Sequence, residues 1–156
     1  MRQCEVRGML WLLILALLYS PLNAQSKKTH AQKLVDSIAQ RHSEITGLEL
    51  SATPAGQKGC VTIAATKAKD LGEKCDKDED TAIRTGEPFV EPEPDGFDVT
   101  APLHDATGKL IGALGIDFKP QPGQSKADVL KLTALLLKEV EPQIPSNAFL
   151  FQPVSD

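Results

Sequence analysis

Apolar residues recur at helical spacing near both ends of the chain. Between residues 26 and 46 they recur every three or four positions, and Thr29 and Gln32 form a capping-box pair near the start of this stretch. A second stretch is capped by Ser125 and Asp128 and runs to Glu141, after which Pro142 stops it. These patterns predict long helices at the N- and C-terminal ends of one domain.

Between these helices the apolar residues alternate with polar ones, as in β-strands. Alternation predicts strands over residues 48–53, 60–66, 97–103 and 110–118, while prolines in 86–96 predict an extended edge segment. A brief helix is expected over 76–85, before Gly86. Short turns between consecutive strands indicate antiparallel pairing. The predicted fold class is α+β, with an antiparallel sheet of about five strands flanked by long N- and C-terminal helices.

The first 24 residues differ in character from the rest. Arg2 and Arg7 precede an apolar run of ten residues from Met9 to Leu18, and the small residue Ala24 marks the expected cleavage point. We interpret residues 1–24 as a secretory signal peptide and residues 25–156 as a single domain. The apolar run is short for a bilayer span, which needs about 20 residues. The expected location is periplasmic or secreted, without stable membrane insertion after cleavage.

Removal of this segment changes the charge and the aromatic content. Of 156 residues 132 remain, with 15 basic and 20 acidic side chains and with five Phe but neither Trp nor Tyr. Nucleic-acid binding depends on a basic surface, often with aromatic side chains on which bases stack. We therefore expect no nucleic-acid partner.

Cys60 and Cys75 are the cysteines that remain after cleavage. An even number in an exported chain predicts a disulfide, which would close a loop of about 15 residues and contribute about 3 kcal/mol in the chain-entropy model. The alternative is a zinc site with His42 or His104, but the spacing typical of zinc ligands is missing. We predict the disulfide and no metal.

The usual catalytic signatures are missing from the sequence. It contains no nucleophile elbow, zinc-protease motif, Walker loop or dinucleotide-binding glycine motif. Cysteines joined in a disulfide do not act as nucleophiles. The sequence therefore predicts a protein that is not an enzyme and that uses no cofactor.

Residues 70–98 hold eleven carboxylates against three basic side chains. Asp76, Asp78 and Asp80 have the spacing of the first three ligands of an EF-hand calcium loop, but Thr81 stands where that loop needs glycine. The favoured interpretation is the solvated first turn of a short helix, where the helix dipole favours acidic residues. A calcium-stabilised structural or protein-interaction domain is the alternative function.

Three short motifs carry a family resemblance. They are the turn Thr85-Gly86-Glu87-Pro88, the strand end Pro102-Leu103-His104-Asp105 with Gly108 after it, and the strand Gly112-Ala113-Leu114-Gly115-Ile116-Asp117. Over residues 28–142 the chain resembles extracytoplasmic PAS-like sensor domains of the Cache family. The resemblance implies a sensor fold, a small-molecule ligand and a membrane signalling partner. Members are usually fused to a kinase, cyclase or chemoreceptor, and we expect no such output domain in this sequence.

The predicted hairpin of 97–103 and 110–118 has two unlike faces. If Leu103 pairs with Leu110, one face is apolar and the other carries Asp98, Thr100, His104, Ala113, Gly115 and Asp117. Small residues beside polar ones are typical of a cavity for a small ligand. Two alternatives remain: the same face is exposed to solvent, or Asp98 and Asp117 only pair with Arg84 and Lys119.

These observations predict an exported, sensor-like domain that binds a small molecule without catalysis. Two nearby carboxylates repel each other unless a cation shares the site, so an amine is the favoured ligand. The predicted ligand-binding residues are Arg84, Asp98, Thr100, His104 and Asp117.

Overall fold

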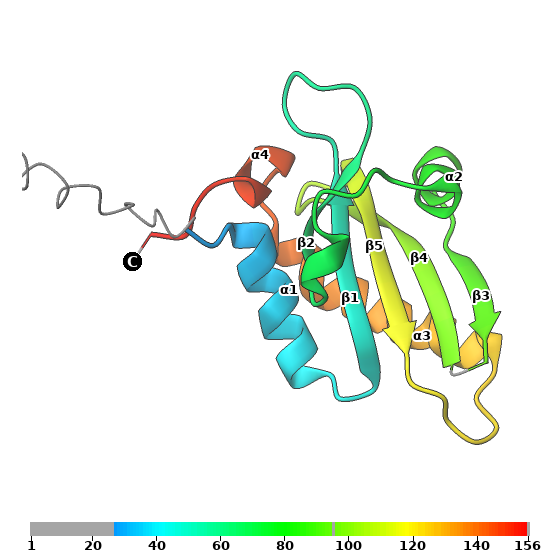
Figure 1. Ribbon diagram of the computed structural model, residues 1–156. Helices are drawn as coiled ribbons and strands as arrows, with labels where there is room; N and C mark the ends of the chain where they lie inside the picture. Colours follow the sequence, from blue (N-terminus) through cyan, green and yellow to red (C-terminus); the bar gives the residue numbers. More distant parts are fainter. Residues whose placement is uncertain (1–26, 95, 156) are drawn as a thin grey trace, which may run out of the picture.

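The computed structural model describes residues 27–94 and 96–155 and shows one antiparallel sheet with helices on both faces (Figure 1). In chain order the elements are α1 (His30–Arg41), β1 (Ile45–Ala52), β2 (Val61–Ala65), η1 (Ala68–Asp70), α2 (Lys77–Thr85), β3 (Phe89–Glu93), β4 (Gly96–His104), β5 (Leu110–Phe118), α3 (Lys126–Val140), η2 (Glu141–Gln143) and α4 (Asn147–Leu150). The predicted α+β fold with five antiparallel strands is confirmed. The predicted signal peptide lies outside the described residues.

The strand order is β2-β1-β5-β4-β3, so the two strands that come first in the sequence join the other three through β5. Hairpins connect β1 with β2 and β4 with β5. β5 pairs along most of its length with β1 on one side and with β4 on the other. The segment between β2 and β3 crosses the sheet and carries η1 and α2 (Figure 1).

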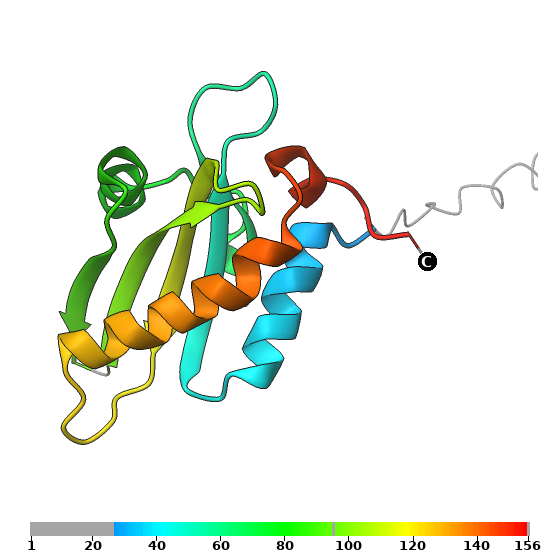
Figure 2. The ribbon, with the colours of Figure 1, turned by 180° about the vertical axis from the view of Figure 1, so that it is seen from behind.

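The hydrophobic core lies between the sheet and the pair α1 and α3, which cover the same face (Figure 2). In the sheet register Leu50 lies opposite Leu114, and Ile116 lies between Leu48 and Val99; all five are at most 1% exposed. The helices contribute Leu34, Val35, Ile38, Val129, Leu136 and Val140 to the same core. α2 packs on the other face, over β4 and β5.

The N-terminal helix is shorter than predicted. Thr29 caps α1 by accepting the Gln32 N–H, but the helix ends after 12 residues at Arg41. Ile45 already belongs to β1, where it pairs with Phe118, and Gly47 pairs with Asp117 in the same strand. Pairing with the central strand overrides the helical periodicity of this stretch. α3 has 15 residues and is capped by Ser125 and Asp128, as predicted.

The register of the β4–β5 hairpin differs from the prediction by two residues. Leu103 lies opposite Gly112 instead of Leu110, and a β-bulge follows, so that His104 pairs with Leu110. The Asp105 carboxylate accepts the N–H groups of Thr107 and Lys109 and widens the turn. A shift of two residues preserves the alternation of faces, so the predicted division into an apolar and a polar face holds up to Leu103.

The two ends of the described chain lie side by side. Thr29 forms a β-bridge with Pro153, and the Val154 N–H donates to the Lys28 carbonyl at 2.8 Å. The Phe149 ring stacks on His30, with ring centroids 4.0 Å apart. The C-terminal segment thus docks on the start of α1. Within the described ranges, the chain has no helix with the length and apolar character needed to cross a membrane.

Candidate functional site

The sheet face away from α1 and α3 carries polar side chains at its centre. Glu49 of β1 and Thr100 of β4 lie on either side of Gly115 of β5 in the sheet register. One pair further along, Asp117 lies between Gly47 and Asp98. Alternation places these residues on one face because their neighbours Leu48, Val99 and Ile116 point into the core.

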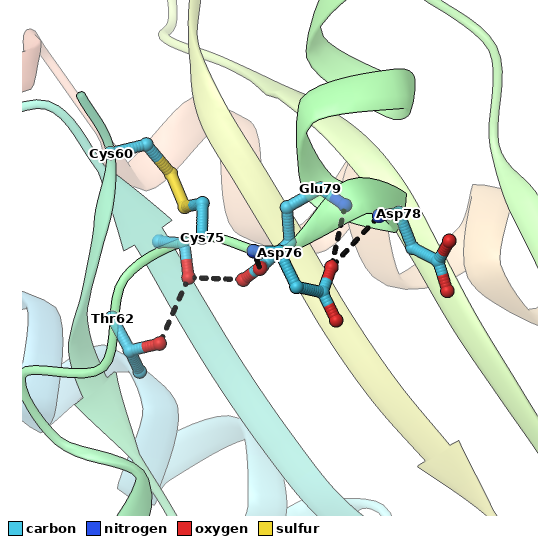
Figure 3. Close-up of a disulfide and its surroundings, with 7 residues drawn as sticks. Cys60, Thr62, Cys75, Asp76, Asp78 and Glu79 are labelled. Carbon is cyan, nitrogen blue, oxygen red and sulfur yellow. Dashed lines mark hydrogen bonds between the residues drawn. A yellow bond between two sulfur atoms is a disulfide. The ribbon is translucent and has the colours of Figure 1, made fainter.

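Residues 72–75 form a wall beside this face. The Thr62 N–H donates to Glu73 O at 2.9 Å, and Gly72 N–H donates to Thr62 O at the same distance. Cys75 N–H donates to Cys60 O at 3.1 Å, and the predicted Cys60–Cys75 disulfide joins the same two residues, with Cα atoms 5.3 Å apart (Figure 3). The disulfide thus fastens the start of α2 to the edge strand β2.

The first turn of α2 is anchored to the sheet. Asp76 caps the helix by accepting from Asp78 N–H and Glu79 N–H, and the Glu79 carboxylate accepts from Asp76 N–H in return (Figure 3). The other Glu79 oxygen accepts from the Ser51 hydroxyl at 2.7 Å. The acidic turn is a helix cap, as interpreted from the sequence. Among the described residues, no three acidic, His or Cys side chains are grouped so as to hold a metal ion.

A cavity of about 130 Å³, which we call the α2 pocket, lies between the polar sheet face and the segment leading into α2. Seven carboxylates and one lysine are among its lining residues, so the lining is strongly acidic. The full lining is Gly47, Glu49, Thr62, Glu73, Lys74, Asp76, Asp78, Glu79, Asp98, Thr100, Gly115 and Asp117.

A second cavity of about 270 Å³, which we call the Lys67 pocket, adjoins the first. It is lined by Thr46, Lys67, Glu93, Phe97, Asp98, Asp117 and Phe118. Asp98 and Asp117 line both cavities and so mark where they meet. The Lys67 ammonium donates to Asp117 Oδ2 at 2.6 Å from the side of the larger cavity.

Two carboxyl groups of the site have raised pKa values. Burial, the hydrogen bond with Asp70 and the charges of Asp70, Asp117 and Glu79 raise the pKa of Glu49 to about 7. Burial and the charges of Asp117, Asp78 and Glu93 raise the pKa of Asp98 to about 6. A positive charge nearby would favour the ionised form of both carboxyl groups. The two carboxylates would in turn stabilise a cation bound in the pocket.

The structure brings together three of the five predicted ligand residues. Asp98, Thr100 and Asp117 line the α2 pocket. Arg84 is exposed on α2 and lines neither cavity, so the structure does not bring it together with the other three. His104 also lines neither cavity: it follows the bulge after Leu103, and its Nδ1 bonds with Glu141 Oε1 at 2.9 Å.

The ion pairs considered as an alternative to a pocket do not form. The Lys119 ammonium donates to the Ser43 carbonyl, and Asp117 pairs with Lys67 instead. Asp98 is half-buried in the cavity wall and does not pair with Arg84. The solvent-exposed face considered as an alternative is therefore replaced by a lined cavity.

Sequence reasoning missed several residues of this site, namely Gly47, Glu49, Thr62, Lys67 and Glu79. Alternation in β1 carried a signal for Glu49, since it stands between Leu48 and Leu50, which are both buried. That signal could not place Glu49 in the site without the pairing of β1 with β5, and these two strands are far apart in the sequence.

Comparison with known proteins identifies the fold. No protein-family model matches the chain, and no curated protein matches it. The structure is similar to the second GAF domain of DevS from Mycobacterium smegmatis, with a TM-score of 0.55 and 16% identity over 71% of this chain and 88% of that one. It is also similar to the GAF domain of an Acinetobacter phosphoenolpyruvate-protein phosphotransferase, with a TM-score of 0.53 and 13% identity over 78% and 82% of the two chains. The chain has a GAF-type fold.

This result refines the resemblance drawn from the sequence. GAF domains belong to the PAS-like fold class, so the predicted PAS-like fold is confirmed at that level. The two structures named above are GAF domains, and the sequence motifs alone did not separate GAF from Cache domains.

The prediction that the chain is not an enzyme is corrected by the same comparison. A type II free methionine-R-sulfoxide reductase from Thermoplasma acidophilum has this fold as well, with a TM-score of 0.56 and 15% identity over 77% of this chain and 91% of that one. The missing motifs belong to other folds, so their absence does not exclude catalysis by a GAF-type domain.

Proposed function

We propose that this GAF-type domain binds a small organic cation in the α2 pocket and is sensor-like in function. The acidic lining is the observation that carries the proposal: seven carboxylates and one lysine surround a cavity between the sheet and α2. Like charges gathered in one cavity repel one another, and a bound cation relieves that repulsion. An anionic ligand would increase it.

The two raised pKa values support the same ligand class. Glu49 of β1 lies opposite Gly115 and Asp98 of β4 lies opposite Asp117, and burial opposes the ionisation of both carboxyl groups. An ammonium group donates several hydrogen bonds and carries the opposite charge, so it suits both carboxylates. A cavity of about 130 Å³ accommodates a compact group of this kind.

Thermal unfolding with simple probes tests this proposal. We expect 1,4-diaminobutane to raise the melting temperature, because a ligand that binds only the folded state stabilises it. Butyrate and 1,4-butanediol, which lack the positive charge, should leave the melting temperature unchanged.

Two variants assign the effect to the pocket. Asp98→Asn should abolish the stabilisation by diamine, whereas Glu87→Gln removes an exposed carboxylate outside both cavities and should retain it. Equal stabilisation by butyrate, or full diamine binding by Asp98→Asn, would contradict the proposal.

We further propose that the domain is exported and serves a membrane signalling partner. The basic and apolar stretches of residues 1–24 support export, and so does the disulfide, since disulfides persist in oxidising compartments. The narrower Cache assignment rests on the sequence motifs alone. N-terminal sequencing of protein recovered from outside the cytoplasm should give a chain that starts at Gln25. An intact N-terminus would refute cleavage.

A second candidate function arises from the position of the disulfide. Lys74 and Asp76 line the α2 pocket on either side of Cys75 in the sequence, and Thr62 lines it near Cys60. A reduced cysteine pair here would reduce a sulfoxide: the sulfoxide oxygen leaves as water, the two thiols become the disulfide, and an external thiol regenerates them. The similar reductase fold makes methionine R-sulfoxide the substrate to try.

One assay distinguishes the reductase function from cation binding alone. If the chain is a reductase, methionine should form from methionine R-sulfoxide with dithiothreitol and the wild type, but not with Cys75→Ser. Turnover equal to that of a protein-free control excludes this candidate and leaves the binding proposal untouched.

A further inference from the structure

We infer that Lys67 is an internal substitute for the ammonium group of the ligand, and that a linear diamine displaces it from Asp117 and occupies both pockets. This inference rests on the proposed function and names the ligand class of the same site. It assigns to Lys67 a role in specificity: its ammonium competes with that of the ligand.

The first observation is the position of the ion pair. Lys67 lies two residues after the end of β2, just before η1, and reaches across β1 to Asp117 of β5, with Nζ 2.6 Å from Oδ2. The side chains are 46% and 38% exposed, respectively. Solvent-exposed ion pairs of this kind are weak, so another cation of the same chemistry can replace the lysine.

The second observation is the space made for the Asp117 carboxylate. A Cβ atom at Gly47 would lie 2.0 Å from Asp117 Oδ2, so any other residue at position 47 would clash with this carboxylate. Gly47 thus lets the carboxylate of Asp117 lie over β1, where it faces both cavities. The charge of Asp117 is therefore available to whichever cation occupies this place.

The third observation is that the two pockets meet at Asp98 and Asp117. When Lys67 leaves Asp117, a chain of methylene groups can pass from one cavity to the other. One ammonium group then takes the place of the Lys67 ammonium at Asp117. The second lies in the α2 pocket near Glu49 and Glu79, which have no lysine hydrogen-bonded to them in the described structure. A monoamine satisfies one of these positions, and a diamine satisfies both.

Calorimetric titration with 1,4-diaminobutane and with butylamine tests the inference. Lys67→Met removes the competing charge and keeps much of the length of the side chain, so diamine should bind it about two- to fivefold more tightly than the wild type, in line with the weakness of exposed pairs. Lys69→Met removes a neighbouring charge that pairs with Asp70 and not with Asp117, and it should show no such gain. The double variant Lys67→Met/Asp117→Asn should bind diamine no more tightly than the wild type.

A direct readout follows the lysine itself. Reductive methylation with ¹³C-formaldehyde before the titration labels Lys67, and its NMR signal should move toward that of a free lysine as diamine is added. Lys67→Gln provides a second variant if Lys67→Met does not fold.

The outcomes separate the two claims. If no amine binds to the wild type or to any variant, the proposed function fails. If diamine binds the wild type but Lys67→Met binds no more tightly, or if Lys69→Met gains equally, the role of Lys67 is refuted while the pocket remains. Butylamine binding as tight as that of diamine would refute occupation of both pockets.

Discussion

Three glycines of the sheet meet different neighbours, and these contacts decide what each position tolerates. A Cβ at Gly112 would lie 2.0 Å from the Ser51 carbonyl oxygen, which belongs to the backbone of β1. At Gly47 the clashing atom is the end of the Asp117 side chain, which can rotate. At Gly115 the nearest atom is Glu49 Cβ at 3.6 Å, an ordinary contact.

We therefore expect alanine substitutions to differ in their effect on the free energy of unfolding. Gly112→Ala should lose about 1–3 kcal/mol, as overpacked positions do. Gly115→Ala should change stability by less than about 0.5 kcal/mol. Gly47→Ala should fall between them and should also weaken diamine binding, since Asp117 must move. Urea unfolding of the three variants gives the order, and equal losses at positions 112 and 115 would contradict it.

Glu49 makes stability depend on pH in a defined direction. Its pKa is about 7 in the folded protein and 4.5 in an unperturbed glutamate, so the folded state holds the proton more tightly. The wild type should therefore lose stability, through this group, as pH rises from about 4.5 to about 7. Over that interval Glu49→Gln should lose less, and melting temperatures of both proteins across the range measure the difference. Parallel curves would show that Glu49 ionises normally.

At the scale of elements, His42 and Arg41 join the end of α1 to α3. His42 bonds Glu44 at 2.7 Å and Glu139 at 2.9 Å, and Arg41 Nε donates to Glu139 at 3.1 Å. Partial burial opposes the charged imidazolium, but the hydrogen bonds and charges of the two glutamates outweigh this and raise the pKa of His42. The residue considered as a zinc ligand instead links two helices.

This link should stabilise the protein below neutral pH. A histidine with a raised pKa contributes fully below its unperturbed pKa of 6.5, and the contribution is lost as pH rises through the folded value. Below pH 6.5 His42→Gln should be less stable than the wild type by at most about 1 kcal/mol. At pH 9 the deficit should shrink, as chemical denaturation at both pH values would show. A deficit that is the same at both values would mean that packing, not charge, is lost.

Elements were predicted well where their signals are local. The capping residues Thr29, Asp76 and Ser125 begin the helices that the structure shows, and Gly86 ends α2 with a positive φ of 71°. The end of α1 and the pairing of β1 with β5 depend on contacts between distant segments, which periodicity does not report. The same limit applied to the site: residues of the β4–β5 hairpin were found, whereas Glu49 and Lys67 were missed.

For the whole molecule, the disulfide links the polar layer to the sheet. It joins the start of β2 to the residue before Asp76, and its loop contains η1 and the wall of the α2 pocket. Most of the hydrophobic core lies on the other side of the sheet. The polar layer therefore has few apolar contacts of its own, and it depends on the covalent link and on the hydrogen bonds of residues 72–79.

Replacing both cysteines with serine should cost about 3 kcal/mol, the value expected for a loop of this size. The loss should be accompanied by weaker diamine binding, because hydrogen bonds alone then hold the wall of the pocket to β2. Urea unfolding and calorimetry of the double variant measure the two effects. Alkylation of the untreated wild type should modify no thiol; two alkylated cysteines in an intact-mass spectrum would show that the bond does not form.

Because the two ends of the described chain are adjacent, the domain is suited to circular permutation. Lys28 and Val154 are already hydrogen-bonded, so a short peptide could bridge them without disturbing α1 or α4. The exposed turn Ala55–Gly59 between β1 and β2 offers a place for new termini. A circularly permuted chain with its termini in this turn should fold to the same sheet. A reporter protein fused to one of the new termini would lie next to Cys60 and the edge of the pocket.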